Sequence, residues 1–203
     1  MAGNKREVIV EAAFEAFAAN GFAAARLEDI AVRAGVAKGT LYLYFDNKAA
    51  LFEAVVRHMI LPVVERAEGL LTPSPEDVSA ETLLRRQVRT FYREVAGTRL
   101  RALLRLMIAE GERFPDLAAF YHREVIARVL DVFRRTLEYG EARGELRATP
   151  AREFPQLVIA PLVLAAIWKL TFDAAAPLDV EALCDAHLDV LLDGLRAPDV
   201  PAR

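Results

Sequence analysis

Apolar residues recur at helical spacing along almost the whole chain, and few stretches alternate as a half-buried strand would. Near the N-terminus, Ile9, Ala13 and Phe17 fall on one stripe, while the glutamates among them lie elsewhere. Asn20 and Gly21 both tolerate left-handed backbone geometry and are typical of a helix end. The pattern predicts an all-α fold whose first helix spans about 5–20.

Further helices are predicted wherever helical spacing is bounded by glycine, proline or a capping residue. They span about 27–34, 38–44, 47–71, 80–96, 99–113, 115–143, 151–172 and 179–195, which makes about nine helices in all. Asp46 or Asn47 should cap the fourth helix, and Pro62 should kink it or mark its late portion. Pro115 and Pro155 stand where first-turn prolines belong.

The amino-acid composition of the chain is apolar and slightly acidic. Hydrophobic residues make up 54% of the 203 residues and the formal net charge is −3, while the mean hydropathy is +0.20. Such a composition indicates a large cavity wall or an apolar oligomer interface in addition to a core. Any positive charge for binding nucleic acid must therefore be local.

The chain has one cysteine, Cys184, so it forms no internal disulfide and suits a reducing cytoplasm, where we expect the protein. The longest apolar run, 157–168, is too short to cross a bilayer, and no signal-peptide pattern opens the chain. We therefore expect no membrane partner.

Residues 27–48 join two short helices through a glycine turn. Ile30 and Ala31 give the first of them an apolar inner face, and Gly35 permits the positive φ of a tight turn. Three cationic side chains against one acidic one give 33–48 a net charge of +2. Binding of nucleic acid through this segment would rest on a few aimed contacts.

The second of these helices carries small, cationic and hydroxyl groups. Lys38, Gly39 and Thr40 occupy its first turn, where backbone N–H groups favour anions, and Gly39 has no side chain to hold a phosphate backbone away. Tyr42 and Tyr44 add hydroxyls on stiff side chains. Taken alone these are also ordinary surface residues, and it is their register with the glycine turn that favours contact with DNA.

The chain resembles the TetR family over residues 5–52. The resemblance is carried by AAFEAFAANGF (12–22), IAVRAGVAKGTLYLYF (30–45) and NKAALF (47–52). It implies an N-terminal three-helix helix-turn-helix DNA-binding domain over 1–52 and a helical ligand-binding and dimerisation domain over 53–203. A long helix at about 47–71 would connect them, and the turn-like segment TPSPEDVS (72–79) is the best boundary candidate on composition.

The resemblance implies which residues meet DNA: Arg26, Lys38, Gly39, Thr40, Tyr42, Leu43, Tyr44 and Lys48. Lys48 would touch phosphate, and Leu43 could meet a thymine methyl group. Arg26 and Ala37 depart from the family pattern, because each replaces a hydroxyl residue that caps a helix, at a cost of about 1 kcal/mol. Arg26 is expected to reach a phosphate instead.

The family's C-terminal part holds an effector and dimerises through the last two helices. The expected interface residues are Leu157, Pro161, Leu164, Leu188 and Leu191. Residues 103–125 also resemble the regulatory domain of AefR-like members. The ligand candidates are Phe91, Leu103, Met107, Phe114, Phe120, Tyr121, Phe133 and Trp168, with Glu110 and His122 as polar points. Trp168 fits the dimer seam equally well.

Plainer interpretations stand beside these. Aromatic residues at helical spacing are more often core than pocket lining. Cys184 and His187 share a helix face, but a metal site lacks further convincing ligands, so we expect neither metal nor cofactor. We also see no catalytic constellation, because Glu110 and Glu112 do not face each other on a helix. A helical enzyme or carrier and a DNA-binding factor without an effector remain the rival hypotheses.

The functional expectation is a ligand-responsive transcriptional regulator. We expect a homodimer that represses by binding a palindromic operator in double-stranded DNA. A small, mainly apolar molecule would release it by changing the spacing of the two DNA-binding heads.

Overall fold

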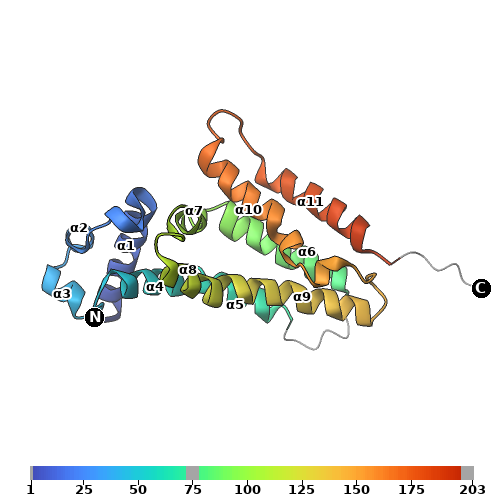
Figure 1. The fold of residues 1–203 in the computed structure, drawn as a ribbon, viewed down its shortest axis with the longest axis horizontal. Helices are drawn as coiled ribbons and strands as arrows, with labels where there is room; N and C mark the ends of the chain where they lie inside the picture. Colours follow the sequence, from blue (N-terminus) through green and yellow to red (C-terminus); the bar gives the residue numbers. More distant parts are fainter. Residues whose placement is uncertain (1, 72–77, 198–203) are drawn as a thin grey trace, which may run out of the picture. The chain divides into compact units, whose positions relative to one another are not determined.

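The computed structural model describes residues 2–71 and 78–197, and in this part of the chain the regular elements are helices (Figure 1). One isolated antiparallel bridge joins Leu146 to Arg196. Most of the turn expected at 72–79 lies outside the described residues.

The helices follow one another with short turns. They are α1 (Ala2–Ala24), α2 (Leu27–Arg33), α3 (Lys38–Tyr42), α4 (Lys48–Met59), α5 (Leu61–Gly69), α6 (Ala80–Phe91), α7 (Arg101–Glu110), α8 (Pro115–Tyr121), α9 (Ala127–Ala142), α10 (Gln156–Thr171) and α11 (Val180–Leu195). Two π-helical turns, η2 (Tyr92–Ala96) and η3 (His122–Ile126), prolong α6 and link α8 to α9, and η4 (Pro150–Arg152) is a 3-10 turn. Some of these segments are separated by no more than one residue. When each such group is counted as one helix and the short η4 is left out, the described part has nine helices, as expected.

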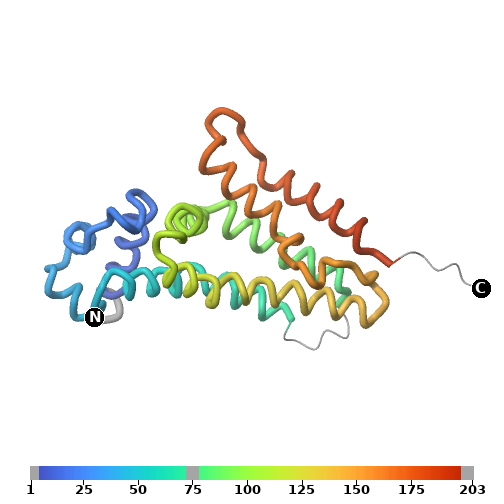
Figure 2. Tube along the Cα trace, in the orientation of Figure 1, coloured from blue at the N-terminus to red at the C-terminus, as the bar shows by residue number. Residues whose placement is uncertain are grey.

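The contacts group the chain into two compact units. The first comprises the chain up to Pro62 together with Ala102–Val125, and the second comprises Val63–Arg101 and the chain from Ile126 onward. The first unit therefore contains α1 to α4, all of α8, and all of α7 except its first residue. In the second, α6 packs on α9, and α10 runs alongside α11 (Figure 2). The domain division at residue 52 stays a prediction.

Local signals set the helix ends of the first unit. Gly21 interrupts α1 with φ 79° and ψ 168°, and Gly35 makes the turn between α2 and α3 with φ 66°. Asn47 caps α4, because its Oδ1 accepts a hydrogen bond of 2.8 Å from the N–H of Ala50. Arg26 and Ala37 give α2 and α3 no side-chain cap, as their residue types predict.

Aromatic side chains form the core around the end of α1. The ring of Phe22 lies 5.6 Å from that of Phe17, 5.8 Å from Phe52 on α4 and 4.9 Å from Phe114 ahead of α8, measured between centroids. Such tilted and edge-on ring pairs add stabilisation beyond their apolar area. They bind α1, α4 and the α7–α8 turn into one core.

The helix expected over 47–71 is interrupted near Pro62, as predicted: it consists of α4 and α5, separated at Ile60, because Pro62 has no N–H to continue the ladder. Two other predicted boundaries need correction. The helix expected from 151 begins at Gln156, so Pro155 is its N-cap and not a first-turn residue. The helix expected over 99–113 is shorter, Arg101–Glu110.

Candidate nucleic-acid interface

The pair α2 and α3 has a buried side and an exposed side. Ile30 and Leu41 are fully buried and Ala31 and Phe45 nearly so, and α2 packs on α1 while α3 packs on α2. The apolar inner face predicted from the sequence is therefore present. The rest of α3 faces away from the core of the first unit.

The exposed side of α3 carries most of the residues expected to meet DNA. Lys38 and Gly39 are exposed in its first turn. Tyr42 is 43% exposed and Leu43 83%. Thr40 and Tyr44 are half-buried beside them, and Arg26 is exposed ahead of α2. The structure thus groups these residues around one short helix, and their DNA contacts stay a prediction.

Gly39 has no structural need to be glycine. A Cβ atom there would meet no atom of residues 2–71 or 78–197 within 4 Å, and its φ is not positive. Glycine inside a helix costs about 0.5–1 kcal/mol relative to alanine. Among the described residues, no close packing against Gly39 compensates for this cost.

Lys38 has a carboxylate partner in α2. Its Nζ lies 2.5 Å from an Oε of Glu28, and both side chains are more than half exposed. The hydrogen bond from Lys38 lowers the pKa of Glu28, and Glu28 in turn raises the pKa of Lys38. Exposed pairs are weak, so a DNA phosphate can compete with Glu28 for this ammonium group.

Lys48 is placed differently from the phosphate contact expected of it. Its Nζ donates to the carbonyls of Ala23 (2.9 Å) and Ala25 (3.0 Å) and lies 4.7 Å from the centroid of the Phe22 ring. Burial lowers the pKa of this ammonium group. Lys48 therefore fastens α4 to the end of α1, and its phosphate contact stays a prediction.

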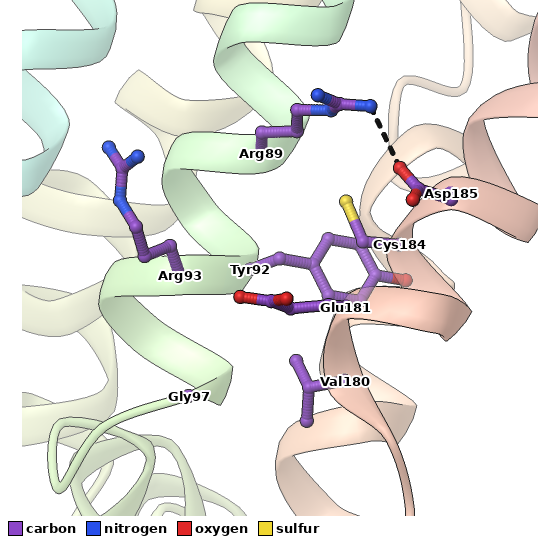
Figure 3. A pocket seen from close by; sticks show the side chains of 8 residues that line it. All are labelled: Arg89, Tyr92, Arg93, Gly97, Val180, Glu181, Cys184 and Asp185. Atoms are coloured by element: carbon purple, nitrogen blue, oxygen red, sulfur yellow. Dashed lines mark hydrogen bonds and ion pairs between the residues drawn. The ribbon is translucent and has the colours of Figure 1, made fainter.

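The second unit contains a pocket of about 450 Å³ between α6–η2 and α11. It is lined by Arg89, Tyr92, Arg93, Gly97, Val180, Glu181, Cys184 and Asp185. In Figure 3 the guanidinium of Arg89 reaches across to Asp185, at 2.8 Å, and Tyr92 points toward α11. Burial raises the pKa of the Cys184 thiol, which therefore stays protonated near neutral pH.

The predicted ligand residues do not line this pocket. Phe91 and Phe133 lie in the core of the second unit with ring centroids 5.7 Å apart. Trp168 donates from Nε1 to the carbonyl of Ala176, at 2.8 Å, and so holds the α10–α11 turn. The others belong to the first unit, where Leu103, Phe120 and Tyr121 are buried, Met107, Glu110 and Phe114 half-buried, and His122 exposed. Their role as ligand contacts stays a prediction.

The predicted dimer residues divide between surface and core. Leu157 and Leu164 of α10 are 58% and 55% exposed, and Pro161 and Leu191 are half-buried. Leu188 is fully buried within its own chain. It therefore belongs to the core of the second unit, which a pattern of leucines alone does not reveal, and a partner would meet its neighbours instead.

Over residues 2–71 and 78–197, no group of three histidine, cysteine or acidic side chains is placed to hold a metal ion. In the same ranges, no helix combines the length and the apolar character needed to cross a membrane.

An all-helical chain that presents a helix-turn-helix at its N-terminus belongs to the helix-turn-helix class of regulators. Residues 9–55 match the family of bacterial regulatory proteins named after TetR, and residues 75–187 match the tetracyclin repressor-like C-terminal domain. The second match alone spans more than half of the chain, so the chain belongs to the TetR family of transcriptional regulators.

Individual proteins similar to this chain are also named as regulators. The uncharacterised HTH-type transcriptional regulator YvdT of Bacillus subtilis is 37% identical over 67 residues, which cover 33% of this chain and 34% of YvdT. TtgR of Pseudomonas putida is 29% identical over 92% of this chain and 90% of its own length. The solved structure of the flavonoid-responsive regulator FrrA has a TM-score of 0.64 and 27% identity, covering 98% of this chain and all of that one.

Proposed function

We propose that a homodimer of this chain represses transcription by binding a palindromic operator in double-stranded DNA through α3, and that a small molecule releases it. Two such helices would enter successive major grooves about 34 Å apart. The effector acts only if it favours a spacing of the two heads that the operator does not fit.

The observation that carries the proposal is the surface of α3. Its exposed side presents a cation, a glycine and a tyrosine hydroxyl on a helix held from behind by buried Leu41. Gly39 is the most informative of them, because no atom of the described residues occupies the space that a side chain would take. A phosphate backbone passing close to the helix explains why that space is left open.

The pocket between α6–η2 and α11 supports an effector site in the second unit. Its volume of about 450 Å³ suits a small ligand. The lining combines Tyr92, Val180 and Cys184 with four charged side chains, two of which form the Arg89–Asp185 pair. We infer an effector that has an apolar part and also presents polar groups to these charges. FrrA is a flavonoid-responsive regulator, and a flavonoid fits an effector of this class.

Exposed apolar side chains support dimerisation through the last two helices. Leu157 and Leu164 lie seven residues apart on α10, and both are more than half exposed. Val190 on α11 is 76% exposed. A partner's α10 and α11 would cover these side chains in a four-helix interface. Burial of this kind also accounts for the high hydrophobic content of the chain.

The test begins with selection of bound duplexes from a random library by the pure protein. The proposal predicts enrichment of one palindromic sequence, bound by two chains. Tyr42→Ala should weaken binding of that duplex about tenfold or more and leave the circular dichroism spectrum unchanged. Failure to enrich any duplex, or equal affinity of the Tyr42→Ala protein, contradicts the proposal.

A further inference from the structure

Where α1 is interrupted at Gly21, side chains from α7 provide the hydrogen bonds that the helix itself lacks. In an unbroken helix the N–H of Phe22 would bond to the carbonyl of Ala18. Here the N–H of Phe22 donates to Oε1 of Glu110, at 2.6 Å, and the carbonyl of Ala18 accepts from the guanidinium of Arg105. Helix α7 thus supplies a partner for each of the two groups.

Glu110 acts as a helix cap supplied from a distant segment. Its second oxygen, Oε2, accepts from the N–H of Ala23 at 2.8 Å, so one carboxylate serves two successive backbone donors. These N–H groups open the single helical turn that follows Gly21, and a negative charge is favourable there. We call this arrangement, the carboxylate of Glu110 on the N–H groups of Phe22 and Ala23, the Glu110 latch.

The far end of the same turn is held by the opposite charge. Lys48 donates to the carbonyls of Ala23 and Ala25. A cation is favourable at this end of a helical turn, where carbonyl groups lack partners. The turn therefore has an anion from α7 at its start and a cation from α4 at its end, and Arg26, the N-cap residue of α2, follows immediately.

The Glu110 latch requires a glycine at position 21. Gly21 has φ 79°, and a Cβ atom there would lie 2.2 Å from Oε1 of Glu110. Phe22, the next residue, is buried in the aromatic core with Phe114 from the α7–α8 turn. The close approach of Glu110 to the backbone thus depends on a residue without a side chain.

We propose that Glu110 is a positioning residue for operator recognition, which fixes the turn 21–25 and thereby the place of α2 and α3. The inference rests on the proposed function. Without the latch, the turn loses its N-terminal cap and α3 samples other placements, so the fraction of protein competent to bind DNA falls. The role is distinct from the ligand contact that the sequence suggests for Glu110.

The test compares Glu110→Gln and Glu110→Ala with Glu112→Gln, a matched control at an exposed glutamate two residues on. Affinity is measured for the duplex that the wild-type protein selects from a random library. Glu110→Gln should bind about tenfold more weakly, since it loses one charge-assisted bond, and Glu110→Ala more weakly still. The dependence of affinity on salt should keep its slope, because α3 itself is unchanged.

Gly21→Ala supplies an independent arm. In the wild-type background it should reduce affinity strongly, and in the Glu110→Ala background it should cost less, because the clash with Oε1 is gone. Additive penalties, or affinity in Glu110→Ala equal to that of Glu112→Gln, overturn the role of Glu110. Amide exchange at Phe22 and Ala23 tests the latch without DNA. Unchanged exchange in Glu110→Ala overturns the latch, whereas a wild-type protein that selects no duplex overturns the proposed function.

Discussion

The imidazole of His187 is buried on α11 and has a polar partner on one side only. Its Nδ1 lies 3.3 Å from the hydroxyl of Tyr92, while its Nε2 is buried without a hydrogen-bond partner among the described residues. Burial lowers the pKa of His187 from its ordinary value of 6.5. The second unit therefore holds this side chain in its neutral form.

This burial makes the stability of the second unit depend on pH. Below about pH 6.5 the unfolded chain protonates His187 while the folded chain does not, so the free energy of unfolding falls as pH is lowered, by at most about 1.4 kcal/mol per pH unit. Above that range the contribution of His187 is constant. Chemical denaturation at about pH 7.5 and about pH 5.5 should show a smaller loss in His187→Gln than in wild type. The same loss in both proteins would contradict this assignment, and exposed His58→Gln is the control.

Side chains that obey local rules could be predicted from the sequence, and those that act at a distance could not. Leu41 is buried as its helical register requires, and Asn47 caps α4 as its residue type suggests. Glu110 and Lys48 bond to backbone groups 88 and 25 residues away. No periodic pattern encodes such a contact, so the sequence suggested a ligand and a phosphate for these two charges.

Helix packing in the second unit depends on a glycine in the last turn of α9. A Cβ atom on Gly140 would lie 2.5 Å from Cδ1 of Leu146 and 2.6 Å from Cβ of Ala80. Ala80 is the first residue of α6, and it has no flexible side chain with which to yield. Gly140 therefore lets α9 approach the start of α6, and the packing gained offsets the low helix propensity of glycine.

Gly140→Ala should lower the free energy of unfolding by about 1–3 kcal/mol through overpacking, in spite of the better helix propensity of alanine. Gly194→Ala in α11 is the matched control, because a Cβ atom there has no neighbour within 4 Å in the part of the chain that the structure describes. The control should gain about 0.5–1 kcal/mol. Denaturant titrations of both variants check the pair, and equal effects of the same sign would refute the account.

At the scale of elements, the sequence predicted helices better than their joints. Helical spacing located three stretches within a few residues of their observed bounds, namely α6 with η2, the run from α8 through η3 to α9, and α11, because amphipathic patterning determines which face is buried. The joint at Ile60 and the short turn η4 depend on how a proline interrupts hydrogen bonds locally. The placement of α7 with the helix-turn-helix follows from packing, which a linear pattern does not contain.

At the scale of the whole molecule, the apolar composition points to a surface that a second copy covers. The exposed leucines of α10 are the residues that carry this inference. Leu164→Glu should convert the dimer into a monomer at micromolar concentration, because a buried charge without a partner is costly. Ile108→Glu, at a site 59% exposed on α7, is the control. Analytical ultracentrifugation decides between them, and a monomeric wild type or a dimeric Leu164→Glu would rule out this interface.

The central claim is that α3 is the part of the molecule that meets DNA, and Gly39→Ala tests it most directly. Within the described chain, the added methyl group meets no atom within 4 Å, so the variant should be as stable as wild type or more stable by about 0.5–1 kcal/mol. A binding titration with the selected duplex should nevertheless show affinity at least about tenfold weaker, because the methyl group meets the phosphate backbone. Wild-type affinity in this protein would contradict the account.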